Sequence, residues 1–190
     1  MIRTLISLAM AVGALTLSAC SQVPLSYQPT LANVETIKSS NVAPMNVGPF
    51  ALAPGRAPTM DQGVQARAAN VTSSVNNSFA AFLKDALTQE LRAAGKFDPN
   101  SGIVVTGLLT KNELDASMGT GKAVLAANFA VTREGASVYN KELEEKAEWP
   151  SGFVGAEAIP LAINNYTSLY KKLLAKLFGD SDFKAATKAK

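Results

Sequence analysis

The segment Gly119-Thr120-Gly121-Lys122 invites comparison with a phosphate-binding loop. The full pattern requires a glycine five residues before Gly121, where Ala116 stands, and a Ser or Thr after the lysine, where Ala123 stands. The segment also lies between two apparent strands and does not open a helix. We therefore interpret it as a hairpin turn.

Carboxylates are concentrated in a second segment, where four of them fall within seven residues: Glu142, Glu144, Glu145 and Glu148. Paired carboxylates can perform acid-base chemistry or bind calcium, but both uses need convergence in a pocket and shifted pKa values. Strand alternation instead places Glu142, Glu144 and Glu148 in one row beside Lys146. We expect this row to form a solvated strand face that discourages edge aggregation.

Histidine is absent from the chain. Its absence excludes Ser-His-Asp and Cys-His catalysis, His-ligated zinc and the usual pH-switch residue. Carboxylate, Ser-Lys and oxygen-ligand metal chemistry remain. The only cysteine, Cys20, lies near the beginning of the chain.

The first residues have the organisation of a secretory signal. Arg3 is followed by an almost uncharged stretch, Leu5 to Leu17, and then by small residues. This stretch is shorter than the about 20 apolar residues that a membrane helix needs, and polar Ser21-Gln22 follow soon after it. We predict that residues 1–19 form a signal peptide that is cleaved before Cys20.

The residues at this cut, Leu17-Ser18-Ala19-Cys20, resemble the bacterial lipobox. The resemblance implies that the Cys20 thiol receives a diacylglycerol and that the new amino terminus is acylated, for example with palmitate. Two or three acyl chains anchor a protein stably without spanning the bilayer. Lipidation also excludes Cys20 from catalysis, metal binding and disulfides. Ser21 stands where the common inner-membrane retention signal has Asp, which favours the outer membrane, with the domain on its periplasmic face or at the cell surface.

Removal of residues 1–19 from the 190-residue chain leaves 171 residues, enough for one domain and a tether. Arg3 leaves with the signal, so 17 of the 18 basic residues remain against 15 acidic ones, a net charge of +2. This charge does not indicate nucleic-acid binding. Arg56 and Arg67 are expected to serve solubility, with contact to an anionic lipid or an acidic partner as the alternative. Lys184, Lys188 and Lys190 are expected to belong to a solvated, frayed end, with contact to anionic lipid as the alternative.

We expect four segments: a signal peptide (1–19), a lipidated flexible tether (20–41), an α+β domain (42–180) and a basic C-terminal tail (181–190). In the domain, Val42 to Phe50 reads as an edge strand because prolines interrupt it. Residues 51–75 lack periodicity, so they are mobile, partly helical or functional.

A helix is predicted after residue 76, because apolar residues recur at spacings of three and four. They are Phe79, Phe82, Leu83, Ala86, Leu87, Leu91 and Ala94. Ser74, Asn76 and Ser78 are candidate N-caps, and Gly95 suits the left-handed end of the helix.

Three β-rich runs follow, at 103–109, 123–132 and 137–149, and predict an antiparallel meander with one solvated face. Tyr139, Trp149 and Phe153 lie near a strand end and are expected in the core, with a ligand or partner groove as the alternative. A second helix is predicted with Pro160 in its first turn. The order β-α-β-β-β-α indicates a two-layer sandwich of a mostly antiparallel four-stranded sheet with two amphipathic helices.

The sequence resembles bacterial lipoproteins of the YajG-like kind in this order of elements, in the segment "VGPF" and in the helix "FAAFLKDALTQELRAAGKF". More loosely, it resembles the auxiliary lipoproteins of envelope transport and lipopolysaccharide assembly. The resemblance covers residues 42–178. It implies an envelope-tethered, non-catalytic protein, and it transfers no functional residue other than Cys20.

Two functions are compatible with these features. The first is a lipid-anchored binding or scaffold module for envelope partners, without cofactor or metal. The alternative is a carrier of a hydrophobic ligand or an auxiliary component of lipid or lipopolysaccharide transport. A carrier needs a deep apolar cavity, whereas a scaffold needs only a filled core. An envelope hydrolase is a third, weaker hypothesis.

Overall fold

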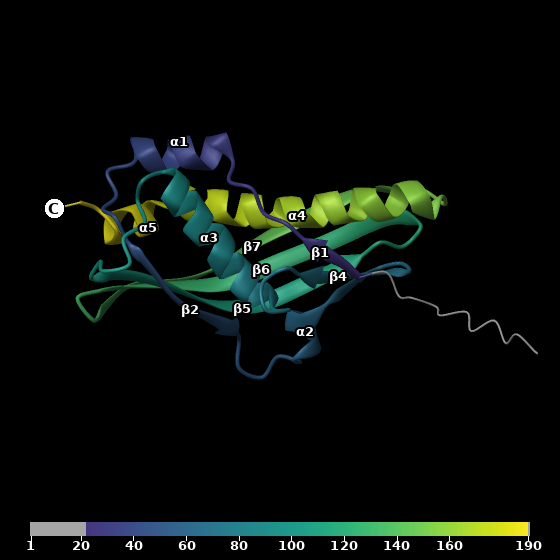
Figure 1. Ribbon diagram of the computed structural model, residues 1–190, viewed down its shortest axis with the longest axis horizontal. Helices are drawn as coiled ribbons and strands as arrows, with labels where there is room; N and C mark the ends of the chain where they lie inside the picture. Colours follow the sequence, from purple (N-terminus) through teal and green to yellow (C-terminus); the bar gives the residue numbers. More distant parts are fainter. Residues whose placement is uncertain (1–21, 190) are drawn as a thin grey trace, which may run out of the picture.

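The computed structural model describes residues 22–189, so Cys20 and the predicted signal peptide lie outside the described residues. Its elements follow in the order β1-α1-β2-α2-β3-β4-α3-β5-β6-β7-α4-α5 (Figure 1). The fold is α+β, as predicted. The prediction of a single four-stranded sheet is wrong, however, because the strands form two mixed sheets.

The larger sheet contains β2 (Asn46–Leu52), β5 (Ile103–Asp115), β6 (Gly119–Arg133) and β7 (Ala136–Ser151), in the order β2-β5-β6-β7. β5, β6 and β7 form the predicted antiparallel meander, and β2 is an edge strand parallel to β5. Only one face of this sheet is covered by helices, which explains the alternation of buried and exposed residues along β6 and β7.

The smaller sheet has the order β1-β4-β3 and consists of β1 (Gln22–Leu25), β4 (Ala69–Ser73) and β3 (Val64–Ala66). β3 and β4 lie in the segment 51–75, together with the short helix α2 (Thr59–Gln62). The strands are only three to five residues long, so their alternation is too brief to give a periodic signal.

The prediction of a flexible tether at 20–41 is wrong for residues 22–41, because they contain a strand of this sheet and a helix. Gln22 to Leu25 pair in parallel with β4, and α1 (Leu31–Ser39) packs against α3 and α4. Leu25, Tyr27 and Ile37 are buried in the main core. These apolar residues are isolated among polar ones, so a local pattern does not reveal the distant partners that bury them.

Two long helices cover the inner face of the larger sheet, α3 (Phe79–Ala93) and α4 (Gly155–Gly179). Ser78, one of the three candidate caps, accepts a hydrogen bond from the backbone N–H of Ala81. Gly95 has φ of +69°, as the predicted helix end requires. Pro160 lies inside α4 and not in its first turn, because the helix already begins at Gly155.

The prediction of a frayed tail at 181–190 is wrong for residues 181–189, which are ordered against the domain. Residues Ser181–Ala186 form α5, which is capped by the Asp180 carboxylate and buries Phe183. The following residues bond to the segment before β2: Ala43 N donates to Thr187 O, and Ala189 N donates to Asn41 O. Among residues 22–189, no helix is long and apolar enough to cross a membrane.

Glycine at position 121 is required by the close packing of β6 on the end of β7. A Cβ atom built on Gly121 would lie 2.3 Å from Cε2 of Trp149. Gly152, in the loop after β7, has no atom within 4 Å of an added Cβ. These two glycines therefore form a matched pair.

We expect Gly121→Ala to lower the free energy of unfolding by about 1–3 kcal/mol, because overpacking forces Trp149 or the backbone to move. Gly152→Ala should change it by less than about 0.5 kcal/mol in either direction. Urea unfolding of the mature protein measures both. Equal stability of the two variants would contradict this account of Gly121.

Candidate functional site

The two segments that suggested catalysis are structural. Gly119-Thr120-Gly121-Lys122 begins β6 directly after the short β5–β6 turn, with Gly119 at φ +92°, so the segment belongs to a hairpin as predicted but lies in its second strand and not in the turn itself. No helix begins there to present amide groups to a phosphate.

The glutamates of β7 lie among lysines. Glu144 accepts from Lys111 at 2.5 Å and pairs with Lys146 at 2.8 Å, and these two hydrogen bonds lower its pKa to about 2. Lys111 reaches across β6 because Ala126, with its small side chain, stands between Lys111 and Glu144 in the register. Glu145 points to the helix side and pairs with Lys176 at 2.8 Å. The predicted solvated row is therefore confirmed, and residues 22–189 contain no cluster of three or more potential metal ligands.

The three aromatic candidates do not form one groove. Tyr139 packs edge-on against Phe183 at 5.7 Å, and Trp149 covers Gly121, so both belong to the core as expected. Phe153 is exposed, and the expectation that it is buried is wrong. It follows the end of β7, in the loop that leads to α4.

Arg67 has a structural role that the sequence did not reveal. It lies in the β3–β4 turn with φ of +56°, and its guanidinium donates four hydrogen bonds. The acceptors are Ala116 O at 2.8 Å, Ser151 Oγ at 3.0 Å, Gly152 O at 2.5 Å and Phe153 O at 3.3 Å. Arg67 thus fastens the small sheet to the end of the large sheet. Arg56 is exposed.

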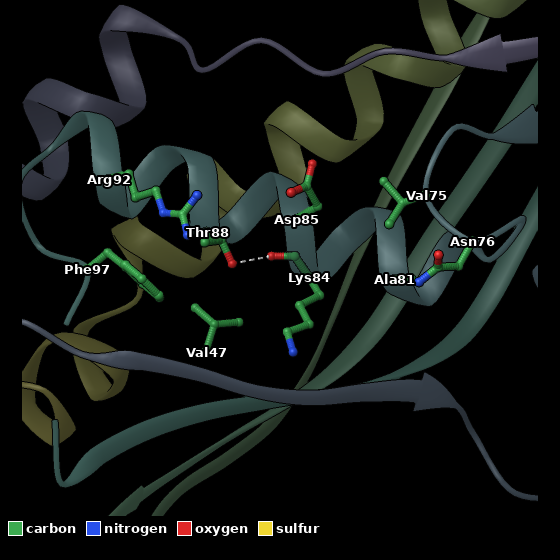
Figure 2. A pocket seen from close by; sticks show the side chains of 9 residues that line it. All are labelled: Val47, Val75, Asn76, Ala81, Lys84, Asp85, Thr88, Arg92 and Phe97. Atoms are coloured by element: carbon green, nitrogen blue, oxygen red, sulfur yellow. Dashed lines mark hydrogen bonds between the residues drawn. The ribbon is translucent and has the colours of Figure 1, made fainter. Parts of the chain in front are cut away.

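The best candidate for a binding site is an open groove between α3 and β2, with a volume of about 420 Å³ (Figure 2). Val47 of β2, Val75 and Asn76 before α3, and Phe97 after it form the floor and the ends. The α3 side is formed by Ala81, Lys84, Asp85, Thr88 and Arg92.

Cations dominate the part of this groove that faces β2. Figure 2 shows the Lys84 ammonium pointing from α3 toward β2, whereas the Asp85 carboxylate points away from it. Arg92 lies over the Phe97 ring, 4.8 Å from its centroid, which holds the guanidinium at the groove end. Among the described residues, neither Lys84 nor Arg92 takes part in an ion pair within 4.0 Å.

The groove runs beside a sheet edge, because β2 pairs with β5 on one side and with no described strand on the other. An unpaired edge can accept an extended chain through backbone hydrogen bonds, although Pro49 removes one donor. An apolar floor with two cations suits an extended segment that alternates apolar and acidic side chains. No single local motif predicts this site, since its residues come from three separate segments.

A buried carboxyl group lies on the opposite side of α3. Glu90 is fully buried, and its Oε1 accepts from Tyr27 Oη at 2.6 Å, Asn33 Nδ2 at 3.0 Å and Thr30 N at 3.1 Å. Burial, and then the hydrogen bond to Glu90, raise the pKa of Tyr27 well above its usual value. All three donors come from the segment that precedes and begins α1, so Glu90 fixes that segment to α3.

Buried aromatic side chains pack against one another in the core of residues 22–189. Tyr166 donates to Asn112 and lies 3.1 Å from the Tyr170 hydroxyl, and Phe79 packs edge-on against its ring. The apolar hollow between α1, α4 and α5, lined by residues such as Ile37, has a volume of about 10 Å³. A space of this size is no larger than about one water-sized probe. It cannot hold an acyl chain.

No known family model matches the sequence, and no curated protein matches it. The fold resembles a crystal structure of a Xanthomonas campestris protein of the family DUF330, with a TM-score of 0.56 and 14% identity, over 83% of this chain and 95% of that chain. A candidate lipoprotein of Caulobacter crescentus gives 0.46, with 9% identity over 80% and 96%. A minor lipoprotein of Acinetobacter baumannii gives 0.42, with 13% identity over 73% and 92%. The first likeness shows a shared fold.

We expect Tyr27→Phe to lower the free energy of unfolding by about 1–3 kcal/mol, because it removes a donor from a buried carboxyl group. Tyr139→Phe is the matched control, since the buried Tyr139 hydroxyl has no hydrogen-bond partner. Its removal should be neutral or slightly stabilising. Denaturant unfolding of both variants checks the contrast, and a Tyr139→Phe variant that is the less stable of the two would refute it.

Proposed function

We propose that this chain is the precursor of a bacterial lipoprotein that is anchored by acyl chains on Cys20 and acts as a non-catalytic binding or scaffold module. The observation that carries the anchor is the segment Leu17-Ser18-Ala19-Cys20, which combines the lipobox pattern with the only cysteine of the chain. The YajG-like resemblance points to the same class.

The outer membrane is the location that we propose, because Ser21 and not Asp follows Cys20. Gln22 already belongs to strand β1 and is two residues after Cys20 in the sequence. Two residues span at most about 7 Å, so the domain is held against the bilayer.

The absence of histidine and the pairing of Glu144 and Glu145 with lysines support a non-catalytic role.

The groove between α3 and β2 is the partner site that this function needs. Its occupant is an extended segment of an envelope protein with acidic side chains, which Lys84 and Arg92 select and the edge of β2 orients. Anchoring raises the local concentration of this domain near membrane partners without new contacts. The carrier alternative receives no support from the core, whose hollow is about 10 Å³.

Cys20→Ala tests the anchor. We expect the variant to accumulate as the unlipidated precursor of 190 residues, because the alanine has no sulfur to accept a diacylglycerol. Palmitate labelling and mass spectrometry measure this result. Ser21→Ala is the control and should be lipidated and cleaved normally. Normal labelling of Cys20→Ala would refute the proposed anchor.

Lys84→Glu with Arg92→Glu tests the groove. A photo-crosslinking residue at Asn76, inside the groove, should capture an envelope partner in cells, and the double substitution should lower the yield about tenfold or more, since charge reversal repels an acidic segment. The same crosslinker at Asn140, on the open sheet face, should give a yield that the substitutions leave unchanged. An adduct at Asn76 that survives charge reversal would contradict an acidic partner.

A further inference from the structure

Large apolar side chains are exposed together at one end of the molecule. Phe153 is 83% exposed, Met118 61% and Val154 58%. Phe153 and Val154 lie in the loop between β7 and α4, and Met118 lies in the turn between β5 and β6. These two loops are neighbours because Gly119 pairs with Ser151. We refer to Met118, Phe153 and Val154 as the apolar tip.

The apolar tip is held in place by hydrogen bonds to the backbone behind it. Arg67 binds Ala116 O and Phe153 O, and Ser151 Oγ bonds to Ala116 O at 3.4 Å. Both loops are therefore fastened at their bases. The exposed side chains are presented by a fixed backbone.

The two loop segments that carry the apolar tip contain no charged residue of their own, although the Arg67 guanidinium lies behind them and Glu157 follows in the first turn of α4. Neither the segment 116–121 nor the segment 150–156 contains a charged residue, and the exposed positions between the bulky side chains are small or hydroxyl-bearing. Soluble domains seldom leave such a set of side chains in water without a binding role. Shallow insertion of the three tip side chains would bury no charged side chain of these two segments, which suits an apolar medium.

The described part of the chain begins at the same end, with Gln22 of β1. β1 and β4 are parallel, and Gln22 pairs with Asn70, three residues after Arg67 in the chain. Arg67 in turn bonds to Phe153 O. In Figure 1 the start of β1, the β3–β4 turn and the start of α4 all lie at the right-hand end, and the C-terminus lies at the opposite end. Cys20 is only two residues before Gln22.

We propose that the apolar tip inserts into the interfacial layer of the phospholipid bilayer that holds the acyl chains of Cys20. This inference rests on the proposed lipid anchor. Phe153, Val154 and Met118 form a second, shallow contact with the membrane, and two contacts fix the orientation of the domain where one leaves it free to rotate. Lys184 belongs to α5, which lies at the opposite end of the molecule from the start of α4, so it is remote from this contact.

The test uses the lipidated mature protein in phosphatidylcholine vesicles. The sulfur of Cys20 becomes a thioether, so Gly152→Cys supplies the only free thiol, beside Phe153 and in open space. A fluorophore on this thiol in the vesicle-bound protein should be about fivefold less accessible to aqueous iodide than the same fluorophore on unlipidated protein in buffer without detergent. The reason is that interfacial insertion excludes water from the label. The same label at Lys184→Cys is the control and should change less than about twofold.

Replacing the apolar tip gives the matched comparison. With Met118→Ser, Phe153→Ser and Val154→Ser in the labelled Gly152→Cys chain, the protein should still float with vesicles, but the protection from iodide should disappear. A label at Gly152→Cys that stays open to iodide in the vesicle-bound parent overturns the insertion and leaves the anchor intact. If Cys20 is labelled as well and the protein does not float with the vesicles, Cys20 carries no lipid, and both the insertion and the anchor are overturned.

Discussion

The larger sheet has one apolar face, and covering that face constrains the rest of the structure. α4 lies along β6 and β7, and α3 lies over β2 and β5. Burial of side chains such as Tyr170, Leu173 and Phe82 removes apolar surface from water, which is the main favourable contribution to folding. The open face then remains free for charged pairs, and the ends of the helices and strands fix where the groove and the apolar tip lie.

Periodic elements were predictable from the sequence, because each is longer than several repeats of its own pattern. α3 and the β5–β7 meander belong to this group, and Ser78 and Gly95 marked the helix ends. β1 and α1 were missed because the segments that bury them lie far away in the sequence, and β3 and β4 were missed because strands of three and five residues give no periodic signal. Tyr27 and Glu90 are 63 residues apart, and no local pattern links them.

The candidate sites divide in the same way. The lipobox-like segment is contiguous and has one chemical requirement, a thiol, so the sequence alone can predict it. The groove combines residues 47 to 97, and Arg67 acts on backbone oxygens 49 to 86 residues away. Such sites depend on tertiary packing. Phe153 shows the converse. An aromatic residue near a strand end suggested the core, but Phe153 lies in the loop before the first turn of α4 and is exposed.

The hydrogen bonds between residues 187–189 and 41–43 join the last residues of the chain to a segment near the start of the domain. Contacts so distant in sequence form late, because the intervening chain must first be gathered. Loss of residues 187–189 would leave the backbone groups of residues 41 and 43 without these partners and would open the seam between α5 and the segment before β2.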